Sequence, residues 1–258
     1  MAVLSKRNII ISCFNIFSAV FIMFFIGLLA YLSKDLPQTF TQMIMSPNVL
    51  IPIITILFSV FSVFFIRKFF LQNTRAEIFF FLIFLLTLNF DGIRSIIFIL
   101  EQLDKPESYV LILTRVAYFG KILGVFVLLC FALMTINTEY KPFATLLSAV
   151  LLLALFVAIL VPFTPNKGNN SLFIPGLDYF FTSLLIIKIL TVLTLVFNYL
   201  QNRNWEYLNL AVSMIFILIG SHTLFYTTSL FGAVLGMALL TTGTVFISYR
   251  IHKLYLWN

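Results

Sequence analysis

Two ionisable side chains interrupt one of the most apolar stretches of the sequence. Asp91 and Arg94 lie three residues apart in the segment LTLNFDGIRSIIFILEQ, whose other residues are mostly Leu, Ile and Phe. Together with Ser95 they have the i, i+3, i+4 spacing of one helix face. A charged side chain at the centre of a bilayer costs about 2.5–3.5 kcal/mol on insertion scales, so it normally faces protein or a wet cavity. The pattern therefore predicts a buried ion pair or a polar site inside a membrane protein.

Other apolar segments also contain ionisable side chains, and the basic ones outnumber the acidic ones. Four basic and two acidic residues share this setting, namely Asp91, Arg94, Arg115, Lys121, Asp178 and Lys188. A surplus of buried positive charge is typical of a site for an anion, such as a carboxylate, a phosphate or a lipid headgroup. With two further polar side chains, we predict a ligand site formed by Asp91, Arg94, Arg115, Tyr118, Lys121, Asp178, Lys188 and His222.

The same charges also fit two simpler interpretations. In the first, they are internal ion pairs that fix helix packing, with Asp91 paired to Arg94 or Arg115, and Asp178 paired to Arg115 or a lysine. In the second, burial keeps the lysines unprotonated, which removes the surplus charge. Residue types and spacing leave these alternatives open.

The composition indicates which solvent surrounds most of the chain. Hydrophobic residues make up 62% of the 258 residues and charged residues 10%, and the mean hydropathy is +1.10. A soluble domain of this length needs far more surface charge, so we predict an integral membrane protein. Cys13 and Cys130 lie in apolar segments, which indicates packing and not a disulfide or a metal site. We expect no cofactor, and no nucleic-acid partner because basic residues are not clustered with exposed aromatic ones.

A membrane-spanning helix needs about 20 apolar residues, and the sequence contains eight such segments. We predict an all-α, polytopic helix bundle that forms one domain over residues 1–258. Its spans are expected at residues 8–32, 49–71, 76–100, 109–136, 143–163, 177–200, 207–226 and 229–249. Because the last two segments are separated by only a few residues, the count would be seven if one of them were re-entrant.

The connecting segments differ in their content of basic residues. With the N-terminus placed inside, nine Lys and Arg residues fall in inner segments and three in outer loops. By the positive-inside rule, this bias predicts that both termini are cytoplasmic in the cytoplasmic membrane of the cell. The same topology places most of the intramembrane charges in the outer half of the bilayer, so we expect the pocket to face outward.

From the second expected span onward, the layout resembles the seven-helix N-terminal membrane sensor region of bacterial histidine kinases. A basic loop, RKFFLQNTRAE, precedes a helix that ends at Glu101, and RVAYFGKILGVFVLLCFAL is similar to that family's Tyr-x-Gly and Phe-Ala-Leu pattern. VPFTPN and QNRNWE resemble its later loops, and the similar region covers residues 49–252. The chain differs by one additional N-terminal helix, by the missing Trp of the third helix, and by having no output domain after Asn258. The resemblance implies a detached sensing module that acts through a separate protein partner.

We therefore expect a non-enzymatic sensing or binding module, because no Walker, HExxH or GxSxG motif occurs in the sequence. The alternatives are a transporter and a membrane subunit of a larger complex, while an enzyme acting on lipid would need an acid–base cluster that the spacing does not provide. We expect contacts with membrane lipids and with a protein partner. Two GxxxG motifs favour close helix packing, either with that partner or within the bundle, at Gly120, Gly124, Gly232 and Gly236.

Overall fold

The computed structural model describes residues 45–69, 76–102, 106–136, 143–167, 171–177 and 179–256, together with Ile16. The first expected span, residues 8–32, lies outside the described residues except for Ile16. The candidate site residue Asp178 lies outside them as well.

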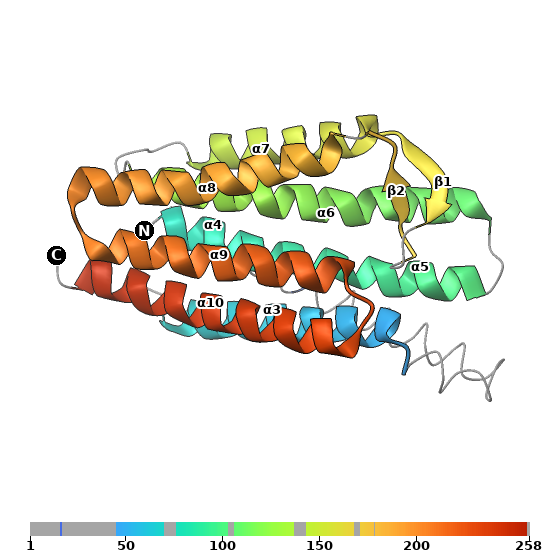
Figure 1. Cartoon of the computed structure of the whole chain (residues 1–258), viewed down its shortest axis with the longest axis horizontal. Coiled ribbons are helices and arrows are strands. Elements are labelled where there is room, and N and C mark those ends of the chain that lie inside the picture. Colours follow the sequence, from blue (N-terminus) through green and yellow to red (C-terminus); the bar gives the residue numbers. More distant parts are fainter. Residues whose placement is uncertain are drawn as a thin grey trace.

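The chain forms a bundle of helices that run back and forth along one long axis (Figure 1). In chain order the elements are α3 (Pro47–Phe69), α4 (Ala76–Thr87), the 3-10 segment η1 (Leu88–Asp91), α5 (Gly92–Gln102), α6 (Glu107–Met134), α7 (Phe143–Leu160), β1 (Phe163–Lys167), β2 (Phe173–Pro175), α8 (Phe180–Asn202), α9 (Trp205–Tyr226) and α10 (Leu230–Leu256).

Within the described residues, six helical stretches are long and apolar enough to cross a membrane. They are Pro47–Ile66, Ala76–Gln102, Glu107–Met134, Phe180–Asn202, Trp205–Tyr226 and Leu230–Ile251. The apolar helix α7 is shorter, with 18 residues. These features confirm the predicted all-α bundle and are those of a multi-pass membrane protein. Both α9 and α10 have spanning length, and α10 continues seven residues beyond the predicted end at residue 249.

The composite helix α4–η1–α5 occupies the centre of the bundle. Its most apolar window is 89% buried, whereas the corresponding windows of α8 and α10 are 22% and 28% buried. The side chains of α4 from Glu77 to Thr87 are all buried, as expected for a helix that is apolar on every side. By contrast, α7 exposes large side chains such as Leu152 and Phe156, which agrees with its lack of charge.

The span predicted at residues 76–100 corresponds to the helical stretch Ala76–Gln102, within which the type of helix changes. Leu88–Asp91 forms a 3-10 turn, and the Gly92 N–H donates to the carbonyls of Asn89 and Phe90 before α5 begins. Asn, Asp and Gly are poor helix formers, which weakens the α-helix at this point. A 3-10 stretch inside a helix changes the direction in which side chains point. Asp91 consequently lies at the junction of α4 and α5.

Between α7 and α8, the strands β1 and β2 pair as an antiparallel hairpin. The ring of Phe163 in β1 lies 5.4 Å from that of Tyr118 in α6, centroid to centroid. Figure 1 shows the hairpin beside the first turns of α6 and the end of α5. We call this end of the molecule the hairpin end. It is the end at which α9 finishes and α10 begins.

The GxxxG glycines are used for packing within the chain. Gly120 and Gly124 of α6 lie against η1 and α4, where their missing side chains leave room for Phe90 and Thr87. Gly232 and Gly236 of α10 lie against the turn after α9 and against α9 itself. Close internal packing, one of the two interpretations of these motifs, accounts for all four positions.

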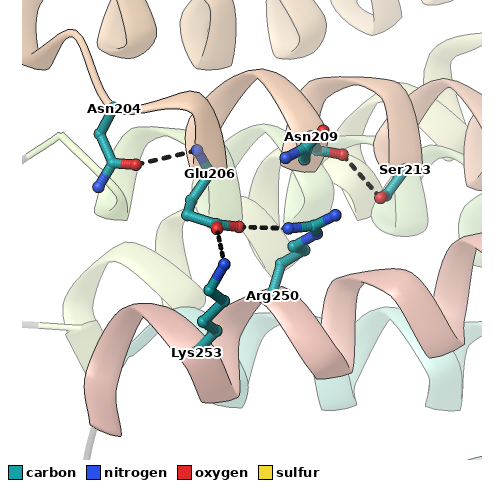
Figure 2. A network of polar contacts seen from close by, with 6 residues as sticks. All are labelled: Asn204, Glu206, Asn209, Ser213, Arg250 and Lys253. Atoms are coloured by element: carbon teal, nitrogen blue, oxygen red, sulfur yellow. Dashed lines mark hydrogen bonds and ion pairs between the residues drawn. The ribbon is translucent and has the colours of Figure 1, made fainter. Parts of the chain in front are cut away.

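A polar cluster joins α9 and α10 at the end opposite the hairpin (Figure 2). The carboxylate of Glu206 accepts from Arg250 Nη1 at 2.8 Å and from Lys253 Nζ at 2.7 Å. The side chain of Asn204 caps α9 by accepting from the Glu206 N–H at 3.0 Å. Because a short turn joins the same two helices at the hairpin end, α9 and α10 are held together at both ends.

We predict that Gly220→Ala will destabilise the protein by about 1–3 kcal/mol, the usual cost of overpacking. An added Cβ would lie 2.7 Å from the backbone nitrogen of Leu240 and 2.8 Å from the carbonyl oxygen of Gly236, so α9 and α10 would have to separate. Helix propensity acts in the opposite direction, since Ala is favoured over Gly by about 1 kcal/mol. Thermal unfolding in detergent micelles measures the change.

Gly176→Ala serves as the control, because the nearest atom to its added Cβ is a methyl carbon of Thr164 at 3.3 Å. A Gly220→Ala protein that is as stable as the Gly176→Ala protein would contradict the close backbone contact of α9 with α10.

Candidate functional site

Arg94 is fully enclosed between α5 and the end of α9, with 1% of its surface exposed. Its Nη1 donates to the carbonyl of Leu224 at 2.8 Å, and its Nη2 donates to the carbonyl of Thr227 at 3.3 Å. The last carbonyls of a helix have no partners within that helix and form the negative end of its dipole. Arg94 therefore acts as a cap for α9, supplied by another helix.

Lys121 reaches the same region of α9 from α6. Its Nζ donates to the carbonyl of Ser221 at 2.8 Å and lies 4.9 Å from the centre of the Phe225 ring. The guanidinium of Arg94 lies 5.6 Å from the centre of the same ring. Both distances are within the range of cation–π attraction. Two cations from two helices thus surround one aromatic residue near the end of α9.

Asp91 is the last residue of η1. Its side chain is buried and interacts electrostatically with Lys121 and Arg94. It lines a small internal cavity of about 20 Å³, together with Lys121, Ser221 and the two glycines of α6, Gly120 and Gly124. This volume is about that needed to hold one water molecule. The break in the central helix therefore places a carboxylate where α6 and α9 meet.

A much larger groove lies between α8 and α9, with a volume of about 610 Å³. Most of its lining is apolar, and the polar groups within it are Lys121, Lys188, His222, Tyr226 and Thr182. Its apolar residues are Phe181, Leu184, Leu185, Ile189, Val192, Leu193, Ile215, Leu218 and Ile219. A mostly apolar cleft with a few polar groups is the usual form of a small-molecule site.

Three of the five polar groups of this groove are basic, namely Lys121, Lys188 and His222. Lys188 Nζ lies 3.1 Å from His222 Nδ1, and the His222 ring lies 4.7 Å from that of Tyr226. Among the described residues that line the groove, none is acidic. At 3.1 Å the Lys188 ammonium can donate to Nδ1 of a neutral His222, which leaves its other donors and the imidazole Nε2–H to bind an anion. The groove therefore favours a ligand with an apolar body and an anionic head.

The structure brings the predicted site residues together in two adjoining groups. Asp91, Arg94 and Lys121 form the interior group, and Lys121, Lys188 and His222 form the groove group. Lys121 belongs to both.

Two other predicted residues lie apart from both spaces. Tyr118 is buried among the rings of Phe163, Phe180 and Phe225, at centroid distances of 5.4–5.7 Å. Arg115 is half-buried and lines neither space, and its Nε is buried without a hydrogen-bond partner in the described part of the chain.

Sequence reasoning missed the parts of the site that are not ionisable. The backbone carbonyls that hold Arg94 and Lys121 have no signature in the sequence, and Phe225 is one of 32 Phe residues. Tyr226 could have been found, because it follows His222 by four residues and so shares its helix face.

A second groove, between α3 and α10, differs from the first in its polar groups. Its volume is about 630 Å³, and its lining includes Ser62, Thr241, Thr244 and Ser248 among aromatic and aliphatic side chains. None of the described residues that line it is charged. The two grooves are therefore similar in size, but the one between α8 and α9 carries the cations.

Comparisons with protein-family models, with curated proteins and with solved structures found no match for this chain. The resemblance to histidine-kinase sensor regions therefore stays a prediction.

We predict that Arg94→Ala will lower the free energy of unfolding by about 3–5 kcal/mol, as is usual when one partner of a buried charge network is removed. The substitution leaves the carbonyls of Leu224 and Thr227 without these donors and removes a cation beside Asp91. Chemical or thermal unfolding of the purified protein in micelles measures the loss.

Arg115→Ala is the matched control, because it removes the same side chain from a neighbouring helix at a half-buried position that lines neither space. We expect its effect to be less than half that of Arg94→Ala. Equal losses would show that Arg94 has no special role as a cap.

Proposed function

We propose that this protein is a non-enzymatic binding module of the cytoplasmic membrane that takes up an anionic amphiphile in the groove between α8 and α9. The observation that carries the proposal is the cluster of Lys121, Lys188 and His222 in an otherwise apolar groove without an acidic residue among its described lining. A carboxylate or a phosphate on an apolar chain satisfies both features.

The exposed surface of α8 supports this proposal. Leu185, Ile189 and Leu193 line the groove and have 49–55% of their surface exposed. If α8 spans the bilayer, these side chains face lipid, so an amphiphile can enter sideways from the membrane. The charged head then moves from the headgroup region to Lys188 and His222 while its chain stays in an apolar environment.

The proposal includes the topology predicted from the charge bias, with eight spans and both termini cytoplasmic. The six described stretches of spanning length and the shorter helix α7 are compatible with it, and the eighth span would be residues 8–32. In that orientation the hairpin end is the outer end, and the basic cluster of Arg250 and Lys253 lies on the cytoplasmic side. A sensing role would then require a separate protein partner.

Binding of radiolabelled oleate to the purified protein in dodecyl maltoside micelles tests the proposal. We expect saturable binding that is at least tenfold weaker for oleyl alcohol, which has the same chain without the charge. Oleoyl lysophosphatidic acid is the third probe, and its affinity relative to oleate distinguishes a phosphate head from a carboxylate head. Equal affinity for oleate and oleyl alcohol would overturn the proposal.

We predict that Lys188→Met will weaken oleate binding about tenfold or more, which corresponds to the loss of one charge-assisted hydrogen bond. Methionine keeps the length and the apolar stem of lysine, so the shape of the groove is largely preserved. Lys253→Met is the control, because that lysine lies in the α9–α10 cluster away from the groove. Equal effects of the two substitutions would show that binding does not depend on the groove.

One observation favours transport of such an anion as a second candidate function. Discontinuous helices are frequent in the binding sites of transporters, and α4–η1–α5 changes from an α-helix to a 3-10 turn that ends at Asp91. Uptake of oleate or a shorter carboxylate into proteoliposomes, lost in Lys121→Met, would support transport. Binding without uptake would support the binding module.

A further inference from the structure

We infer that Lys121 couples occupation of the groove to the break in the central helix, because its ammonium is shared between the groove anion and Asp91. This inference rests on the proposed function. It adds that Lys121 links binding in the groove between α8 and α9 to the interior of the bundle.

The position of Lys121 between two spaces is the first support. Its side chain lines the groove between α8 and α9, and it also lines the cavity of about 20 Å³ that contains Asp91. Leu218 of α9 is the other residue common to both linings. The cavity has room for about one water molecule, so the groove ligand itself cannot reach Asp91. Among the described residues, Lys121 is the charged side chain that lines both spaces.

The hydrogen bonds of Lys121 leave donors available for a groove anion or for Asp91. Its Nζ donates to the carbonyl of Ser221 at 2.8 Å, whereas an ammonium group has three donors. A ligand anion in the groove and the carboxylate of Asp91 both attract this one ammonium, so movement of the side chain toward one of them weakens its interaction with the other.

The charges around Asp91 make the exchange feasible. Asp91 interacts with two cations, Lys121 and Arg94, and Arg94 is fixed to the end of α9 by two hydrogen bonds. When Lys121 turns toward a groove anion, Asp91 retains Arg94 as its counter-charge. The carboxylate is therefore not left as an isolated charge, which would cost several kcal/mol in a low-dielectric interior.

Movement of Lys121 away from Asp91 affects the 3-10 segment η1, because Asp91 is the last residue of that segment. The rest of this segment is wedged against α6, where Gly120 and Gly124 make room for Phe90 and Thr87. Weakening the attraction between Asp91 and Lys121 weakens one of the interactions between η1 and α6. Occupation of the groove between α8 and α9 thereby changes the packing of α4–η1–α5, a central helix that does not line the groove.

A double-mutant cycle on oleate affinity tests this coupling. By linkage, if Asp91 and oleate compete for Lys121, then Asp91→Asn should tighten oleate binding, and we expect about fivefold or more. In the Lys121→Met background, where binding is carried by Lys188 and His222, Asp91→Asn should change the affinity less than twofold.

The Lys121→Met background distinguishes competition for Lys121 from direct electrostatic repulsion between Asp91 and the ligand. Equal tightening by Asp91→Asn with and without Lys121 would show that Asp91 merely repels the ligand, and no tightening in either background would show no coupling. Both results overturn the inference. Failure of the unmodified protein to bind oleate would instead overturn the proposed function.

A second measurement needs no variant at Asp91. Hydrogen–deuterium exchange of the unmodified protein, with and without saturating oleate, should show at least twofold faster exchange in a peptide covering residues 88–92. A peptide from the middle of α10 should be unchanged, and the response of residues 88–92 should disappear in Lys121→Met at oleate concentrations that still saturate it. Oleate binding without any change at residues 88–92 would overturn the inference.

Discussion

The structure depends on how the carbonyl groups at the end of α9 are satisfied away from water. A helix end leaves up to four carbonyls without partners in the helix, and each unsatisfied group in an apolar interior costs several kcal/mol. Here Arg94 of α5 supplies donors to the carbonyls of Leu224 and Thr227. Lys121 of α6 adds a donor to the carbonyl of Ser221, one turn earlier in α9. These contacts set the position of α9 relative to the centre of the bundle. They consequently also set one wall of the groove, because His222 lies on the same part of α9.

The same arrangement explains how two buried cations, Arg94 and Lys121, can lie near each other without destabilising the fold. Arg94 and Lys121 both face the negative end of the α9 dipole, both approach the face of Phe225, and both lie near the carboxylate of Asp91. Lys188 and His222 lie outside this arrangement, at the border with the groove. The surplus of positive charge noted in the sequence is thus divided. One part is neutralised by the protein itself, and the other part borders an open apolar groove.

Much of the fold could be predicted from the sequence, because long apolar segments and their connecting charges are strong signals in membrane proteins. The predicted span at residues 49–71, for example, corresponds to α3 at Pro47–Phe69. The break at Leu88–Asp91 could not be predicted, since single Asn, Asp and Gly residues only weaken a helix and the contacts with Gly120 and Gly124 decide where it changes. Lys188 and His222 were predicted as site residues from their types alone. Their proximity, and the separation of Arg115 from the groove, required three-dimensional packing.

The distance along the chain between Arg94 and the α9 carbonyls that it caps has a consequence for biosynthesis. Leu224 follows Arg94 by 130 residues, which at 5–20 residues per second takes about 7–26 s to translate. During that interval the guanidinium enters the membrane before its final acceptors exist. Asp91 is made three residues earlier and shares the same helix face, so it is already available as a counter-charge. Asp91, which in the folded protein lines the small interior cavity, thus serves first as the counter-charge of Arg94 until the carbonyls of α9 have been made.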